Sequence, residues 1–311
     1  MSCKNVEANE NISFSIQPLT SEEEPNQQGY YDFQGYPGQS EHVKIRVSNL
    51  SDKDIIVRST VNSASTGQAG IPNYGSTDKI DDTLLYPMNM LTKLSEESIN
   101  LTANESKIIE VTINYPKEDW EGQILGGLRF TKETDEKKEG TITQEIAYTI
   151  GIILEMKDGH LPQNELVLND IGIGQRNYRN FIEANIQNTK AVIVENLEIE
   201  SRVINKKGKE VYQYDVKKMR MAPNSNFDFG IPTSDVPLQP GRYTLIIHAI
   251  ADEKEYDFKK EFTISADEAS EFNKSAVNLE VANNHWPYII IGSLTLVILA
   301  LLGLLYKKRA N

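Results

Sequence analysis

Apolar and polar residues alternate along most of the chain between residues 12 and 264, and this pattern predicts a protein built from strands. In the runs 43–47 and 109–113 every second residue is valine or isoleucine, and the residues between them are polar or charged. Proline, glycine and asparagine interrupt such runs, as expected of turns. No stretch before residue 286 keeps a 3.6-residue period, so we expect little helix.

The strand pattern occurs twice, which predicts two domains. A polar segment at 158–164 with Gly159 and Pro162 separates the two halves, so we expect one immunoglobulin-like β-sandwich at 12–157 and a second at 158–265. The run 238–243 (LQPGRY) is similar to the tyrosine corner of immunoglobulin-type sandwiches, in which a tyrosine bonds back to nearby backbone. We therefore interpret Tyr243 as structural rather than as a ligand contact.

The first half is longer than the second by an insertion. Asn49 aligns with Asn188 at an offset of 139 residues, whereas Asn104 aligns with Asn224 at an offset of 120. The extra residues lie at about 63–94, a stretch that mixes tyrosine, leucine and methionine with turn residues. Long insertions on a rigid sandwich often carry binding function, although this one could equally cap an open end of the sandwich.

A transmembrane helix is expected at 286–306, which contains no charged residue. A helix of this length reaches roughly 31 Å, the thickness of the hydrocarbon core of a bilayer. Trp286 and Tyr306 stand at its ends, where aromatic side chains anchor at the interface. Lys307, Lys308 and Arg309 follow, and basic residues of this kind remain in the cytoplasm. The chain is thus expected to be a single-pass membrane protein with its ectodomain outside and the tail 307–311 inside.

The two segments that flank the domains are polar. Residues 1–11 lack the apolar core of a signal peptide, and we expect them to be disordered. Either the true start lies upstream or the chain is tail-anchored, and we favour the first. Residues 266–285 are polar and acidic, which predicts a juxtamembrane spacer.

Composition narrows the functional classes. The 311 residues include 32 basic and 45 acidic ones, a net charge of −13, which argues against binding to nucleic acid. The single cysteine, Cys3, rules out an intrachain disulfide. An anchored ectodomain that is acidic and free of disulfides fits the surface of a Gram-positive bacterium.

No motif predicts catalysis or a cofactor. The four histidines are too far apart in sequence for a metal pair at helical spacing, and neither GxSxG, HExxH nor a phosphate loop occurs in a supporting context. The acidic residues leave a glycosidase carboxylate pair open. We expect no enzyme activity, no cofactor and no metal.

Several short runs along the chain resemble the bacterial WxL-interacting protein family. In the first half they are 31–33 (YDF), 37–39 (PGQ), 47–49 (VSN), 64–67 (ASTG), 70–74 (GIPNY) and 120–127 (WEGQILGG). In the second half they are 184–188 (ANIQN), 221–225 (MAPNS) and 241–243 (GRY). The resemblance covers nearly the whole chain. Members of this family often have asparagine near the position of Gly67 and are made as exported precursors, whereas this chain has glycine there and residues 1–11 do not read as a signal peptide.

The resemblance implies a surface protein whose first domain binds peptidoglycan and whose second binds host proteins, working with secreted WxL-domain proteins. The residues themselves indicate only a non-enzymatic binding scaffold, and we take Tyr74, Tyr86 and Trp120 as candidate contacts because aromatic faces suit sugar rings. Three alternatives remain: a structural spacer, a chaperone-like sandwich that lends a strand to a secreted client, and a wall hydrolase.

Overall fold

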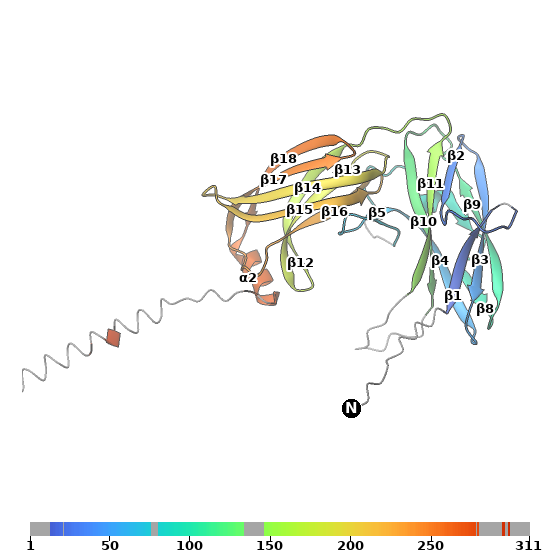
Figure 1. Ribbon diagram of the computed structural model, residues 1–311, viewed down its shortest axis with the longest axis horizontal. Coiled ribbons are helices and arrows are strands. Elements are labelled where there is room, and N and C mark those ends of the chain that lie inside the picture. Colours follow the sequence, from blue (N-terminus) through green and yellow to red (C-terminus); the bar gives the residue numbers. More distant parts are fainter. Residues whose placement is uncertain are drawn as a thin grey trace, which may run out of the picture.

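The protein folds into two β-sandwiches that lie side by side, joined at one side by a hairpin (Figure 1). The computed structural model describes residues 13–20, 22–75, 80–133, 146–277, 279, 294, 295 and 298. The prediction of an all-β protein is confirmed for this part of the chain. Its assignment to the immunoglobulin type stays a prediction.

The first sandwich packs a four-stranded sheet against a five-stranded sheet. The smaller sheet has the order β1 (Phe14–Leu19), β3 (Ser40–Asn49), β9 (Ser106–Asn114), β7 (Thr92–Leu94). The larger sheet has the order β2 (Tyr31–Gly35), β11 (Ala147–Met156), β10 (Gln123–Lys132), β4 (Ile55–Ser63), β8 (Ser98–Leu101). All neighbours are antiparallel except β2 and β11, which are parallel.

Alternation along the strands forms the core of this sandwich. In β3 the alternating residues Val43, Ile45 and Val47 point inward, and from the opposite sheet Leu128 and Ile150 meet them in one buried cluster. Because side chains alternate between the two faces of a strand, a period of two places every apolar residue of such a run on the same side.

The second sandwich packs a three-stranded sheet against a four-stranded one. The smaller sheet has the order β12 (Leu166–Arg176), β13 (Arg179–Asn188), β16 (Ser225–Pro232). The larger has the order β15 (Glu210–Met221), β14 (Val194–Asn205), β17 (Gly241–Ala251), β18 (Lys254–Ile264). Apolar residues of both sheets form one core, which includes Ile182, Phe229, Leu245 and Ile247.

A helix follows the second sandwich where the sequence predicted a spacer. Helix α2 (Ala266–Ser275) begins at a capping box, in which the Ser265 hydroxyl accepts from the Glu268 amide and the Glu268 carboxylate accepts from the Ser265 amide. Ala269 is buried in the core of the second sandwich, and Phe272 packs against it. The first half of the expected spacer therefore belongs to the sandwich.

The predicted membrane span, 286–306, lies outside the described residues except for Leu294, Thr295 and Ile298. A helix long and apolar enough to cross a membrane was not found among the described residues. The basic tail at Lys307, Lys308 and Arg309 and residues 1–11 also lie outside the described part.

Candidate binding site at the junction of the two sandwiches

The insertion predicted at about 63–94 connects β4 to β7, and it reaches across to the second sandwich. Its first part is a short hairpin of β5 (Ser65–Thr66) and β6 (Pro72–Asn73), drawn between the two sandwiches in Figure 1. At the tip, the Gly70 carbonyl oxygen accepts from the Arg220 amide at 2.8 Å. Gly70 has φ +65°, and a Cβ there would stand 2.6 Å from Cγ of Met219. Only glycine fits this approach to β15.

A ring of hydrogen bonds fixes the hairpin to the start of β16. The Ala222 amide donates to Oγ1 of Thr66 at 3.0 Å, and the two hydroxyls of Thr66 and Ser225 are 2.6 Å apart. The Ser225 hydroxyl donates to the Ala222 carbonyl oxygen at 2.8 Å, so Thr66 must be the donor between the two hydroxyls. Thr66 and Ser225 are buried, so the ring satisfies polar groups that water does not reach.

Asp81, later in the insertion, accepts hydrogen bonds from both sandwiches. Its carboxylate accepts from the amide and the hydroxyl of Thr83, at 3.0 and 2.6 Å. From the second sandwich it accepts from Nε2 of Gln187, at 2.9 and 3.1 Å, and from Nδ2 of Asn226 at 2.5 Å. Burial alone would raise the pKa of Asp81, but these hydrogen bonds outweigh it and lower the pKa. The carboxylate therefore stays charged while it joins the two sandwiches.

A second contact joins β10 to the loop between β13 and β14. The Gln123 amide donates to the Ala191 carbonyl oxygen at 2.6 Å, and the Ile193 amide donates to Oε1 of Gln123 at 2.9 Å. Gly122 has φ +78°, and a Cβ on it would lie 2.0 Å from the Ala191 oxygen. This contact therefore requires glycine at position 122.

A small apolar cluster fills the space between these polar contacts. It joins Ala64 and Leu125 of the first sandwich to Ile193 and Ala222 of the second. This cluster and the hydrogen bonds of Thr66, Asp81 and Gln123 together make the junction an extended interface and not a flexible linker.

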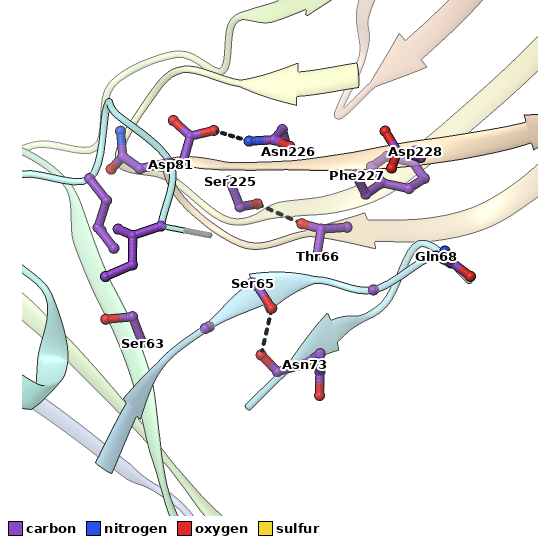
Figure 2. Close-up of a pocket in the computed structure, with 15 residues that line it drawn as sticks. Ser63, Ser65, Thr66, Gln68, Asn73, Asp81, Ser225, Asn226, Phe227 and Asp228 are labelled. Carbon is purple, nitrogen blue, oxygen red and sulfur yellow. Dashed lines mark hydrogen bonds between the residues drawn. The ribbon is translucent and has the colours of Figure 1, made fainter. Parts of the chain in front are cut away.

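The junction encloses a cleft of about 350 Å³. Its walls are residues 63–68, Asn73, Ile80, Asp81 and Leu84 on the side of the first sandwich and residues 224–228 on the side of the second. Figure 2 shows the hairpin and β16 facing each other across this space, with the Thr66–Ser225 hydrogen bond between them. We call this space the junction cleft.

The three aromatic residues predicted as contacts do not lie together on an open surface. Tyr74 is partly buried against the apolar cluster of the junction, with its ring over Gly127, and burial raises its pKa. Tyr86 packs partly buried against the core of the first sandwich. A binding role for these two tyrosines stays a prediction.

Trp120 lies in the core of the first sandwich. Its side chain is only 5% exposed and stacks on Tyr115, with ring centroids 5.6 Å apart. A ring packed in this way contributes core packing, and its faces are not open to a sugar. Its Nε1 has no hydrogen-bond partner among the described residues. The exposed apolar side chains of the insertion are instead Ile71, Ile80, Leu85 and Met90, which are 59%, 52%, 78% and 79% exposed.

Tyr243 lies at the start of β17 and donates from its hydroxyl to the Gln239 carbonyl oxygen at 2.8 Å. A backbone bond of this kind defines a tyrosine corner. Its ring stacks on Phe262 inside the second sandwich.

The junction was not predicted as a site from the sequence. Five of the short runs that carry the resemblance meet there: 64–67, 70–74, 120–127, 184–188 and 221–225. A signal was present in the glycines of these runs, because glycine in a loop often marks a place where another backbone comes close.

Among the described residues, no group of three or more histidine, cysteine, aspartate or glutamate side chains could hold a metal ion.

The solved structures that this chain is similar to include several bacterial fimbrial chaperones. The class 5 fimbriae chaperone CfaA is 14% identical over 80% of this chain and 98% of its own, with a TM-score of 0.32. The E. coli chaperone DraB is 15% identical over 81% and 98%, with a TM-score of 0.29. At these scores the likeness carries no argument about function. A search of curated proteins found no match.

Two family models match successive parts of the chain. Residues 14–132 match the peptidoglycan binding domain of the WxL Interacting Protein, and residues 137–274 match its host binding domain. The second match starts before β11, which pairs with β10 in the first sandwich, and it ends within α2. Both models describe binding domains, and together they span most of the sequence in the order that the resemblance implied. The chain therefore belongs to the WxL-interacting protein family.

Proposed function

We propose that this protein is a binding scaffold anchored in the membrane of a Gram-positive bacterium. It binds peptidoglycan through the first sandwich, binds a host protein through the second, and associates with WxL-domain proteins of the same surface. The observation that carries this proposal is the pair of family matches, at 14–132 and 137–274.

The anchor in this proposal is the apolar run 286–306. Its length, its aromatic ends and the basic residues after it support a single span with the sandwiches outside and residues 307–311 in the cytoplasm. The junction supports the scaffold role, because two sandwiches fixed to each other hold their binding surfaces in a constant relative orientation.

The same proposal excludes catalysis. Both matched families are binding domains. We therefore expect sacculi to be bound without release of soluble muropeptides.

The contact region that we propose is the exposed side of the insertion. Leu85 and Met90 leave most of their apolar surface in water, and burying a side chain of this kind against a partner contributes about 1.5–3 kcal/mol. Neither side chain belongs to the junction, so the insertion can hold the second sandwich and contact a partner at the same time.

The test uses the ectodomain, residues 9–285, incubated in parallel with purified sacculi and with a WxL-domain protein. Pelleting with sacculi, or co-elution with the WxL-domain protein, is the expected result. The double variant Leu85→Ser, Met90→Ser should lose most of the binding to at least one of them, whereas Leu50→Ser, a control at a leucine that is 55% exposed elsewhere, should not.

Two outcomes would count against the proposal. Binding to neither partner would refute the scaffold function. Unchanged binding by the double variant would refute the insertion as the contact region and leave the scaffold in place.

A further inference from the structure

We propose that the junction cleft binds a short, uncharged saccharide segment, and that both sandwiches must be docked for it to bind. The proposal rests on the proposed function in treating the chain as a surface-binding protein. It adds a ligand site that is shared between the two matched domains.

The cleft has two kinds of wall. Side chains with hydroxyl, amide or carboxylate groups line most of it, while Ile80 and Leu84 supply an apolar patch. A sugar ring has the same division, with hydroxyl groups around its edge and C–H groups on its faces. The volume, about 350 Å³, falls within the range of roughly 300–1,000 Å³ that is usual for small-ligand sites.

Several polar side chains of the lining remain to contact a ligand, among them Gln68, Asn73 and Asp228. Among the described residues, the Gln68 side chain has no hydrogen-bond partner. Asn73 accepts from the Gly75 amide through Oδ1, and its amide nitrogen donates to no described atom. Asp228 accepts from Nδ2 of Asn185 through Oδ1, and a carboxylate can accept further bonds through its other oxygen. Figure 2 shows Gln68 and Asn73 on the hairpin and Asp228 on β16.

The charges of the cleft argue against an anionic ligand. Its described lining contains Asp81 and Asp228 and neither lysine, arginine nor histidine. An anionic ligand would meet two carboxylates without a compensating cation, which is unfavourable in a partly enclosed site. Asp81 already accepts bonds from Thr83, Gln187 and Asn226, so it holds the walls together and leaves ligand contacts to the other side chains.

The site is incomplete in either sandwich alone. The hairpin supplies Gln68 and Asn73, whereas β16 supplies Asp228. A ligand that contacts both walls binds only the docked arrangement, so by linkage it must also stabilise that arrangement.

The test measures binding of two neutral probes to the full chain in a zwitterionic detergent that contains no sugar. Chitotriose represents a wall-type glycan and lacto-N-tetraose a host-type glycan. Calorimetry should detect binding of at least one probe, and the tighter of the two identifies the source. The double variant Gln68→Ala, Asn73→Ala should bind that probe about tenfold or more weakly, as expected for the loss of two hydrogen bonds. The control Gln27→Ala, at an exposed glutamine outside the cleft, should bind like the unchanged chain.

Each other outcome would overturn the proposal. If both variants bind the probe as the unchanged chain does, the saccharide site lies elsewhere. If neither probe binds, or if only an extended peptide probe binds, the cleft does not take a saccharide. Pelleting of the double variant with sacculi separates these failures from a failure of the proposed function, because a scaffold that binds through another surface would still pellet.

Discussion

Asp81 is the residue at which hydrogen bonds from the two sandwiches converge. It is 8% exposed, and its carboxylate accepts hydrogen bonds from Thr83, Gln187 and Asn226. A buried carboxylate with this many donors stabilises the fold most when it is ionised and its donors are paired.

Replacing Asp81 by asparagine should therefore destabilise the protein by about 2 kcal/mol, because the new amide group would face the donors Gln187 and Asn226. The lowered pKa of Asp81 means that its contribution is present above the unfolded pKa and is lost as pH falls through the folded pKa. The difference between Asp81→Asn and the unchanged chain in denaturant unfolding should thus shrink as the pH falls below the unfolded pKa of about 3.9. Asp82→Asn, at the exposed neighbour, is the matched control, and an equal loss in both variants would contradict the role of Asp81.

The pKa of His248 is raised, so its contribution to stability depends on pH in the opposite sense. Nδ1 lies 2.9 Å from Oδ1 of Asp257, and this hydrogen bond is the main cause of a raised pKa of His248. Burial opposes it, while the nearby charges of Asp257, Glu255 and Glu200 add to it. Its stabilising effect is fully present below the unfolded pKa of about 6.5 and is lost as pH rises through the folded pKa.

Because the pair is exposed, we expect a small effect on stability but a clear one in an NMR titration of the His248 ring. The apparent pKa should fall toward its ordinary value in Asp257→Asn. An unchanged titration in that variant would show that Asp257 is not the cause.

At the scale of elements, the junction depends on backbones that approach each other closely at glycines. Gly122 carries one such approach between β10 and the loop before β14, and Gly70 carries the other at the tip of the β5–β6 hairpin. These elements were predicted as strands or loops from local pattern, but nothing local in the sequence specified which of them would meet.

Gly122→Ala should therefore weaken the junction, with a cost of at least about 1–3 kcal/mol from the left-handed φ alone and more from the contact with Ala191. The control is Gly172→Ala on β12, where an added Cβ meets no atom within 4 Å. For Gly122→Ala, thermal unfolding should occur at a lower temperature, and small-angle scattering should show two sandwiches that are no longer held together. Gly172→Ala should leave both measurements unchanged. If Gly122→Ala keeps both the stability and the scattering profile of the unchanged chain, the contact with Ala191 does not hold the junction.

Helix α2 is a second element that was not predicted from the sequence. A mainly polar composition suggested a spacer at 266–285, yet a helix begins at the capping box of Ser265 and Glu268 and packs Ala269 and Phe272 against the second sandwich. Composition averages over the whole segment, whereas a helix of three turns needs only one short apolar side to pack.

At the scale of the whole molecule, the junction makes the two sandwiches a single mechanical unit. The contacts at Thr66, Asp81 and Gln123 all cross it, and the apolar cluster around Leu125 would be exposed if it opened. The two sandwiches should thus unfold together and not as independent domains.

Differential scanning calorimetry of the ectodomain should show one cooperative transition. Thr66→Val keeps the shape of the side chain but removes the hydroxyl group that bonds to Ser225 and Ala222. Combined with Asp81→Asn, it should split the single transition into two. Thr60→Val with Asp82→Asn, at positions outside the junction, should leave one transition. Two transitions in the unchanged chain would contradict the coupling.

The sequence by itself determined the class of the fold, the positions of many of its strands and the glycine-marked turns, because a two-residue period and turn chemistry are local properties of the chain. It also led to the family, through runs that matching models then covered. Only the tertiary structure decided that the insertion forms hydrogen bonds with the second sandwich, that Trp120 is a core residue, and that Leu85 and Met90 remain exposed. The reason is that burial depends on segments far apart in the chain: Asp81 meets Asn226 across 145 positions, and no local pattern records that distance.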